Sequence, residues 1–380
     1  MRIAFVSTMS GTPWGGSEEL WVKTALEALN QGHTILASVI DWNGIHKKLQ
    51  VLQNNGALIH LRPRFREYPS NLLSRIKNKI DRTIFNSNPY FEEIKDIIDF
   101  EPDVVIFNQT GTYGVLWANS LTYLLDNFSI KYYLICHGSS EHDVLPYDLI
   151  KKARKIFENA SLIIFASKRN HLNAERELAC KIENYKIIRE TLSIDDLSVV
   201  DWPSEDRVSF ASVGRLSIGD KGQDILLSIF NQPHWRTRNW RLNLYGEGDD
   251  ERYLRDLSKF YNISDRVNFC GYRNIREIWT INHCLLMPSI IEGTPIALME
   301  AMIIGRPSVV SDVGGNAEVI TEGLTGFVAG TYHVNCFSKA IERAWASKEE
   351  WRNIGLEAHY WSLNNLDLYS HKTFLQYILN

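Results

Sequence analysis

The chain has 380 residues, of which 44% are hydrophobic and 23% charged, and its 41 basic and 45 acidic side chains give a formal net charge of −4. A chain of this length and composition folds as a globular protein of two domains, and its near balance of charge argues against nucleic acid as a partner. No apolar run approaches the roughly 18 residues of a membrane span, and no cleavage-type signal follows the first strand-like run, so we expect a cytoplasmic protein.

Short apolar runs alternate with amphipathic stretches through the first half of the chain. Continuous apolar runs are typical of strands buried on both faces, as in parallel sheets, and their alternation with helices indicates βαβ units. The segments expected here are a helix at 17–30 and strands at Arg2–Ser7, Thr34–Ile40, 103–108, Tyr132–Cys136 and 162–166.

The pattern weakens at 191–207, where several acidic residues and Pro203 indicate a linker. The second series of strands is expected at Val208–Val213, 241–245, 267–270, 284–288 and Ser308–Ser311. The sequence therefore predicts two doubly wound α/β domains, residues 1–195 and 205–360, whose ligands bind beyond the carboxyl ends of the strands.

The strongest signal is residues 284–320, which read CLLMPSIIEGTPIALMEAMIIGRPSVVSDVGGNAEVI. We expect a helix with Thr294 as its N-cap and Pro295 as its first residue, and the free amide groups at such a start suit a phosphate. Glu292 and Glu300 are too far apart for a close carboxylate pair, but each can accept hydrogen bonds from a vicinal diol. A nucleotide-sugar offers two such diols, one on the ribose and one on the sugar.

This segment resembles the Glu-x7-Glu signature of retaining glycosyltransferases of family 4, including the Gly-x-Pro at 305–307 and the Ser-Asp-x-Gly-Gly run at 311–315. The resemblance implies the GT-B fold, in which two Rossmann-like domains face a central cleft. It also implies a final helix at 361–380 that packs back on the first domain.

By the same resemblance Glu300 binds the donor ribose, and Glu292 contacts hydroxyls of the transferred sugar. The backbone of Gly293, Thr294 and Pro295 then approaches the sugar and the phosphate. Many family members have Gly-Phe-Gly after the first glutamate where this chain has Gly-Thr-Pro, so the choice of donor sugar stays open.

A second match is residues 210–224, FASVGRLSIGDKGQD. Arg215 follows a strand and Lys221 precedes a helix, and the resemblance implies that both bind the donor diphosphate. Cations at this position stabilise the negative charge that a nucleoside diphosphate develops as it leaves. Gly246 in the turn after the next strand and Arg273 near the nucleobase complete the donor residues that the resemblance implies.

The first half contributes a glycine-rich loop and a histidine. Residues 11–19 read GTPWGGSEE, with Ser17 as a plausible N-cap; Gly15 and Gly16 allow close backbone approach by a ligand, and the resemblance implies that they face the donor diphosphate and the acceptor. His137 follows the strand Tyr132–Cys136, where family members often carry a histidine near the transferred sugar. It would donate a hydrogen bond to a hydroxyl or tune the leaving group.

Residues 62–82, RPRFREYPSNLLSRIKNKIDR, hold seven basic and two acidic residues with apolar residues at helical spacing. Such a stretch suits an anionic membrane surface, but we favour a solvated amphipathic helix packed on its own domain. The membrane reading is a hypothesis, and it would place the protein peripherally on the inner face of the membrane.

The sequence thus predicts a retaining glycosyltransferase that uses a nucleotide-sugar donor and a glycan or lipid-linked acceptor, in cell-surface polysaccharide biosynthesis. No Asp-x-Asp pair occurs in the chain, so no metal cofactor is expected, and no Walker A motif is present. Two alternatives stay open. One is a nucleotide-sugar epimerase of the same fold, and the other is a catalytically silent sugar-nucleotide binding protein.

Overall fold

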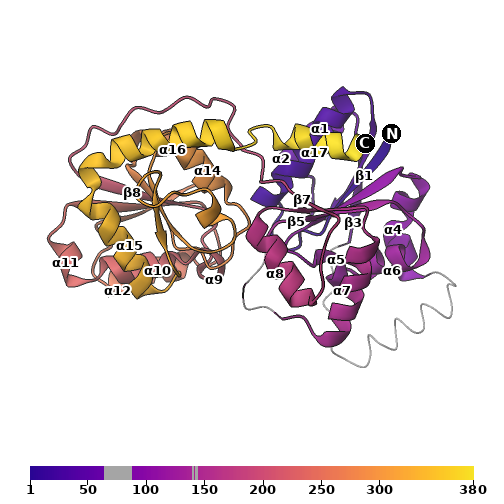
Figure 1. Cartoon of the computed structure of the whole chain (residues 1–380), viewed down its shortest axis with the longest axis horizontal. Helices are drawn as coiled ribbons and strands as arrows, with labels where there is room; N and C mark the ends of the chain where they lie inside the picture. Colours follow the sequence, from indigo (N-terminus) through magenta and orange to yellow (C-terminus); the bar gives the residue numbers. More distant parts are fainter. Residues whose placement is uncertain (64–87, 139–140, 142–143) are drawn as a thin grey trace. The chain divides into compact units, whose positions relative to one another are not determined.

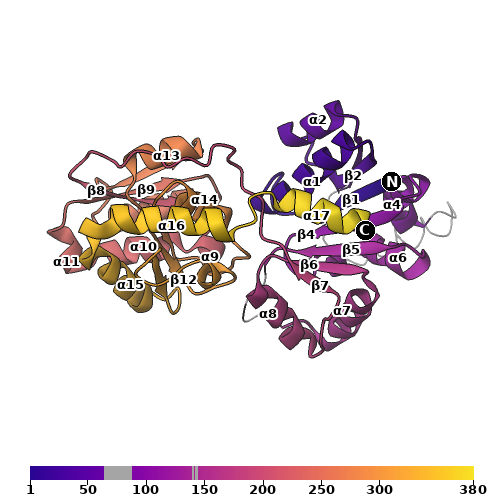
Figure 2. The same cartoon turned by 45° about the horizontal axis from the view of Figure 1, so that its top comes forward.

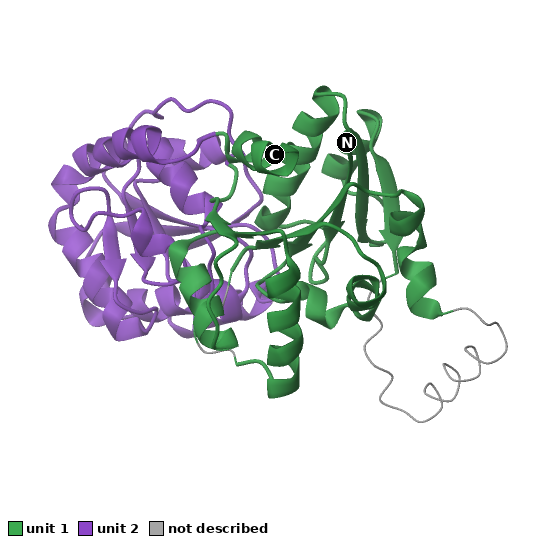
Figure 3. Ribbon diagram, turned by 45° about the vertical axis from the view of Figure 1, so that its right-hand side comes forward, with its two compact units in different colours: residues 1–191, 369–380 green, residues 192–368 purple. Residues whose placement is uncertain are grey.

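The computed structural model describes residues 1–63, 88–138, 141 and 144–380, and these form two compact units (Figures 1 and 3). Unit 1 comprises Met1–Thr191 and Tyr369–Asn380, and unit 2 comprises Leu192–Leu368. Each unit has its own parallel sheet and its own hydrophobic core.

The sheet of unit 1 has the strand order β3-β2-β1-β4-β5-β6-β7, with all neighbours parallel. Every residue of β4 and β5 is buried, as expected for continuous apolar runs. The strands are β1 (Arg2–Ser7), β2 (Thr34–Ile40), β3 (Leu58–Arg62), β4 (Val104–Gln109), β5 (Tyr132–Cys136), β6 (Leu162–Phe165) and β7 (Tyr185–Ile187).

Helices cover both faces of this sheet, and alternate side chains of its central strands enter opposite cores. Ala4 and Val6 of β1 pack in one cluster, while Ile3 and Phe5 pack in the other. The last helix, α17, lies beside α1 (Figure 2). The helices are η1 (Gly16–Glu18), α1 (Glu19–Asn30), α2 (Lys47–Asn54), α4 (Pro89–Asp99), α5 (Gly114–Trp117), α6 (Asn119–Asn127), α7 (Tyr147–Asn159), α8 (Lys168–Leu178) and α17 (Ser370–Leu379).

The sheet of unit 2 is also parallel, in the order β10-β9-β8-β11-β12-β13. Phe210 and Ala211 of β8 enter opposite cores, so this sheet too is covered on both faces. The strands are β8 (Val208–Val213), β9 (Trp240–Tyr245), β10 (Val267–Gly271), β11 (Cys284–Met287), β12 (Ser308–Ser311) and β13 (Phe327–Ala329).

The helices of unit 2 pack on the two faces of its sheet. Side chains of α10 and α15 share one core cluster, and those of α14 and α16 share the other. The helices are α9 (Ile218–Lys221), α10 (Gln223–Phe230), α11 (Pro233–Arg236), α12 (Glu251–Phe260), α13 (Ile275–Ile281), α14 (Ile296–Ile303), η2 (Asn316–Glu318), α15 (Val334–Ala346), η3 (Lys348–Glu350) and α16 (Trp351–Asn365).

The unit boundaries differ from those expected from the sequence. Unit 1 ends at Thr191, the first residue of the predicted linker, and the rest of that linker belongs to unit 2, in whose core Leu192 and Val200 are buried. The predicted final helix at 361–380 is divided between the end of α16, which is in unit 2, and α17, which is in unit 1.

Two helix starts were predicted wrongly. Pro295 is the N-cap of α14 and has an extended backbone with ψ of 124°, so the helix begins at Ile296 rather than Pro295 and Thr294 is not its cap. Ser17 lies inside the 3-10 turn η1, and Glu18 is the N-cap of α1, without a side-chain capping bond.

Most of the basic stretch at 62–82 lies outside the described residues. Its first residue, Arg62, ends β3 and is only 2% exposed, so this side chain does not belong to a solvent-facing basic patch. Within the described ranges, no helix is long and apolar enough to cross a membrane.

Candidate active site

Backbone hydrogen bonds join the carboxyl ends of β8, β9 and β10 in unit 2, next to the predicted donor-binding residues. The amide of Gly246 donates to the carbonyl of Gly271 at 2.9 Å, and the amide of Gly214 donates to the carbonyl of Tyr245 at 2.9 Å. A Cβ atom on Gly246 would lie 2.1 Å from the carbonyl oxygen of Gly214. Only glycine fits there, so the Gly246 turn sets how closely the loops after β8, β9 and β10 approach each other.

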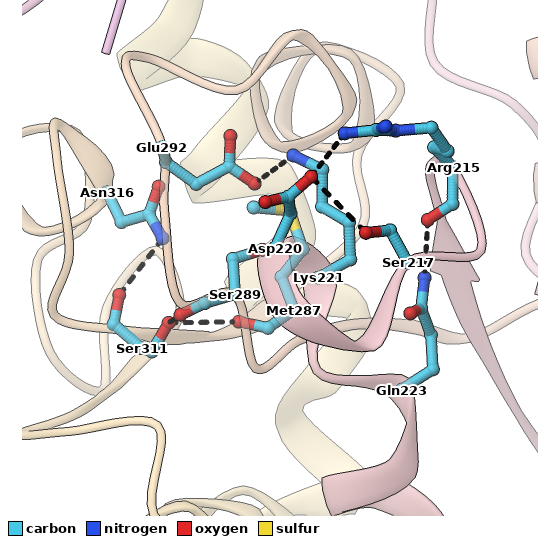
Figure 4. A network of polar contacts seen from close by, with 10 residues as sticks. All are labelled: Arg215, Ser217, Asp220, Lys221, Gln223, Met287, Ser289, Glu292, Ser311 and Asn316. Carbon is cyan, nitrogen blue, oxygen red and sulfur yellow. Dashed lines mark hydrogen bonds and ion pairs between the residues drawn. The ribbon is translucent and has the colours of Figure 1, made fainter. Parts of the chain in front are cut away.

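Two predicted catalytic residues meet at the carboxyl edge of this sheet. The Nζ atom of Lys221, at the end of α9, lies 2.6 Å from Oε1 of Glu292, in the loop after β11 (Figure 4). The Glu292 side chain is 7% exposed and that of Lys221 is 27% exposed. The backbone amide of Ile290 also donates to the carbonyl of Asp220 at 2.8 Å, which ties the two loops together.

Arg215 is held by a second carboxylate in the same place. Its guanidinium forms an ion pair with Asp220, which also accepts a hydrogen bond from the Ser217 hydroxyl at 3.2 Å (Figure 4). The Arg215 side chain is 51% exposed. Two cations therefore lie on adjoining loops, each beside a carboxylate, and an incoming anion such as a diphosphate would compete with those carboxylates for them.

The loop that carries Glu292 rests on the Ser-Asp-x-Gly-Gly run after β12. Gly314 has a φ of +51°, and a Cβ atom on it would lie 2.2 Å from the carbonyl oxygen of Glu292. The amide of Gly315 donates to the carbonyl of Gly293 at 2.5 Å, and the hydroxyl of Ser311 donates to the carbonyl of Ser289 at 2.5 Å. The glycines of this run therefore position the Glu292 backbone by close packing.

Glu300 lies on α14 and is buried, with 4% exposure. Its Oε1 atom accepts hydrogen bonds from the amide of Ser193, at 3.1 Å, and from the Ser193 hydroxyl. Thr294 and Pro295 are buried just before the helix. Arg273 is exposed, and its guanidinium donates to the neighbouring carbonyl of Tyr272 at 3.2 Å; in the described part of the chain, no hydrogen bond joins it to the other predicted residues.

Of the predicted residues of unit 1, His137 belongs to a buried polar network within that unit. His137 follows β5, and its Nε2 lies 2.5 Å from Oδ1 of Asn108 while its Nδ1 contacts a carboxylate oxygen of Glu190. The amide nitrogen of Asn108 donates to Glu18 at 2.8 Å. Both ring nitrogens of His137 are thus engaged within unit 1, so a hydrogen bond to a sugar would require one of them to change partner.

Glu18 anchors this network at the start of α1. Its carboxylate accepts hydrogen bonds from Ser7 at 3.0 Å and Trp21 at 2.9 Å, in addition to Asn108. Burial raises the pKa of Glu18 to about 7, although the bonds from Trp21 and Ser7 oppose this. The Glu18 amide donates to the carbonyl of Gly15 at 3.1 Å. The Gly15–Gly16 turn therefore positions the Glu18 side chain beside Ser7 of β1 and Asn108 of β4.

Four polar partners were not identified from the sequence. They are Glu18, Glu190, Ser193 and Asp220. Asp220 adjoins Lys221 and could have been noted as a counter-ion. Glu190 and Ser193 have no local pattern, since each contacts a residue more than 50 positions away.

Comparison with known proteins agrees with this organisation. Residues 197–360 match the family model described as "Glycosyl transferases group 1". The lipopolysaccharide 1,6-galactosyltransferase of Salmonella typhimurium is 29% identical over 152 residues, which are 38% of this chain and 41% of that protein. Protein CapJ of Staphylococcus aureus is 22% identical over 249 residues, 63% of this chain and 62% of that protein. The chain therefore matches less than two thirds of the length of these curated relatives.

Solved structures with the same fold match over the whole chain. Anabaena Alr3699/HepE in complex with UDP-glucose has a TM-score of 0.72 and 17% identity, over 100% of this chain and 99% of that one. A glycosyltransferase from Rickettsia africae has a TM-score of 0.74 and 14% identity, over 100% and 98%. The predicted fold class is confirmed: the chain has a GT-B fold of two Rossmann-like α/β domains. Together with the family match over most of unit 2, this supports a group 1 glycosyltransferase.

Proposed function

We propose that the protein is a retaining, metal-independent glycosyltransferase that transfers a sugar from a nucleoside diphosphate sugar to a glycan or lipid-linked acceptor. The observation that carries the proposal is the group of Arg215, Lys221 and Glu292 at the carboxyl edge of the unit 2 sheet. The group 1 family match covers the same residues. The relative named as a lipopolysaccharide 1,6-galactosyltransferase supports a role in cell-surface polysaccharide biosynthesis.

In this proposal the two cations bind the donor diphosphate. Lys221 supplies a point charge and Arg215 a planar fork, and both stabilise the negative charge that develops as the diphosphate leaves. In this structure each cation lies beside a carboxylate. The diphosphate would replace these carboxylates as the anion that the two cations bind, and the side chains of Lys221 and Arg215 would need to move little. Fixed protein cations in this position can do the work of a metal ion, which is why we propose independence from metal.

The two glutamates bind hydroxyl groups at opposite ends of the donor. Glu292 accepts from the transferred sugar and Glu300 from the ribose, since a carboxylate accepts well from a diol. The Nζ atom of Lys221 lies 2.6 Å from Oε1 of Glu292, so the proposed positions of the diphosphate and of the transferred sugar adjoin each other. The donor is thereby oriented with its glycosidic bond beside the two cations.

Retention follows from a front-face reaction. The acceptor oxygen forms a bond to the anomeric carbon on the side from which the diphosphate leaves, as the bond from that carbon to the phosphate oxygen breaks. The acceptor proton passes to a phosphate oxygen of the leaving group. No protein nucleophile is needed in this scheme, and Arg215 and Lys221 stabilise the product diphosphate.

The test is a transfer assay with UDP-, GDP- and ADP-sugars, a chelator, and a pool of polyprenyl-linked oligosaccharides. UDP-glucose is the first donor to try, because Anabaena HepE was solved with it. We expect nucleoside diphosphate release and a product whose anomeric configuration, measured by NMR, matches that of the donor. Lys221→Ala should abolish most turnover, whereas Lys259→Ala, an exposed lysine of α12, should not.

Several outcomes would contradict the proposal. A product with the inverted anomeric configuration would refute the retaining mechanism. Loss of activity in the presence of the chelator would refute independence from metal. Interconversion of the donor without an acceptor would favour an epimerase. Binding of donor without any turnover would favour a sugar-nucleotide binding protein.

The membrane hypothesis for 62–82 stays a prediction. A protein that glycosylates a lipid-linked acceptor would work at the inner face of the membrane, and a basic stretch would add affinity for anionic lipid. Sedimentation with phosphatidylglycerol vesicles at low salt tests this. Absence of co-sedimentation would remove the membrane from the proposal.

A further inference from the structure

Glu300 is oriented by a residue from outside its own helix. One carboxylate oxygen, Oε1, accepts both the amide and the hydroxyl of Ser193. The two residues are 107 positions apart, and both belong to unit 2. Hydrogen bonds to an ionised acceptor are about twice as strong as neutral ones, so this pair of donors favours one orientation of the Glu300 side chain.

Ser193 belongs to a segment, residues 192–201, which we call the strap. Leu192 and Val200 are buried in the same core cluster as Leu298 and Met299 of α14. The amide of Val200 donates to the carbonyl of Ile304 at 3.2 Å. The strap is therefore fixed to the helix that carries Glu300 on both sides of Ser193.

Two arginines bind the backbone of the strap. Arg276 donates to the carbonyls of Asp196 at 3.2 Å and Ser198 at 2.9 Å. Arg306, which is buried, donates to the carbonyls of Val200 at 3.0 Å and Asp201 at 2.6 Å. With these anchors the fold of unit 2 sets the position of Ser193, and the serine is not a chance contact of a loose linker.

The contact with Ser193 limits the orientations in which the Glu300 carboxylate can bind a ligand. The terminal torsion of a glutamate side chain is broad and roughly two-fold, so a carboxylate without a fixed partner samples many orientations. Ser193 occupies one oxygen with two donors, and a carboxylate can accept about four hydrogen bonds in all. A ribose diol that binds here therefore meets a carboxylate that is already oriented.

We propose that Ser193 is a positioning residue that orients Glu300 toward the ribose hydroxyls of the donor, and that it thereby sets the preference for ribose over 2′-deoxyribose. The inference rests on the proposed function, in which Glu300 binds the ribose. It adds a residue of the strap to the donor site, which the sequence had assigned to the linker.

The experiment measures the dissociation constants of a nucleotide and its 2′-deoxy form by calorimetry. UDP, GDP and ADP are titrated first into the wild type, and the one that binds best is paired with its own 2′-deoxy form. The variants are Ser193→Ala, Ser193→Thr, which keeps the hydroxyl, and Ser198→Ala. Ser198 is the matched control because it lies on the strap and its hydroxyl bonds to Asp196 and Arg276.

We expect Ser193→Ala to weaken the ribonucleotide about tenfold, which corresponds to one hydrogen bond to a charged group. The 2′-deoxy form should change about twofold or less, so that the preference for ribose largely disappears. Ser193→Thr should restore the preference and Ser198→Ala should retain it.

The proposal would be overturned if Ser193→Ala left the ratio of the two dissociation constants unchanged, whether or not both nucleotides bound more weakly. Ser193 would then be a structural residue only. A wild type that binds with no preference for ribose would overturn it too. A wild type that binds none of UDP, GDP and ADP would instead overturn the proposed function, and the inference with it.

Discussion

Glu18→Gln is expected to remove a pH-dependent part of the stability of unit 1. The Glu18 carboxyl is buried and accepts hydrogen bonds from Ser7, Trp21 and Asn108. Burial raises its pKa from the ordinary 4.5 to about 7. Glutamine has the size of the protonated acid and does not titrate, so the variant keeps the shape of the side chain without its proton equilibrium.

The raised pKa means that the folded protein binds this proton more tightly than the unfolded chain. The corresponding stability is fully present below about pH 4.5 and is lost as the pH rises through about 7. Each pKa unit is worth about 1.4 kcal/mol. The free energy of unfolding of the wild type should therefore fall by about 3 kcal/mol relative to that of Glu18→Gln over this range.

Urea unfolding at a series of pH values, followed by far-UV circular dichroism, measures this difference. The data should be fitted with two transitions, because the chain has two units. Glu27→Gln is the control, since Glu27 lies on the same helix and bonds to the exposed Gln31. If the curves for Glu18→Gln and the wild type run parallel across this range, burial does not raise the pKa of Glu18 and the reasoning is refuted.

Three further predictions concern unit 2. Gly314→Ala should displace the Glu292 backbone and lower the melting temperature by about 5 °C, whereas Gly323→Ala, also at positive φ but in open space, should cost less. Arg306→Met should destabilise unit 2 by about 3 kcal/mol in urea titrations, since several buried carbonyls lose their donor; an unchanged midpoint would contradict this. Lys221→Ala should lower turnover about 100-fold while leaving the melting temperature within about 2 °C, and near-normal turnover would remove Lys221 from the mechanism.

The central strands could be predicted from the sequence, and so could the edge strand β10, but the other three edge strands could not. The expected strand at 103–108 corresponds to β4, every residue of which is buried, so its apolar run is continuous. The strands β3, β7 and β13 were not expected, and all three lie at the edges of their sheets. An edge strand is short or half exposed, as the alternating burial of Leu58–Arg62 shows, so its sequence carries a weaker signal.

The site could be predicted in part for a similar reason. Arg215, Lys221 and Glu292 each follow a strand or precede a helix, and the carboxyl ends of parallel strands meet at one edge of a sheet. Asp220 adjoins Lys221 and could have been noted as a counter-ion, but Ser193, which contacts Glu300, is recognised only from that tertiary contact. Glu190, which contacts His137, likewise comes from a segment with no motif of its own.

The proposed function requires a nucleoside diphosphate to bind at the carboxyl ends of the unit 2 strands through Lys221 and Glu300. The most direct test is a thermal-shift panel of UDP, GDP and ADP, with chelator present, on the wild type, Lys221→Ala and Glu300→Ala. A ligand at 100 times its dissociation constant adds about 2.7 kcal/mol to the free energy of unfolding, which is readily measured. We expect one of these nucleotides to raise the melting temperature of the wild type, and both variants to lose most of that increase. No shift with any of the three, or an equal shift in the variants, would contradict the proposed function.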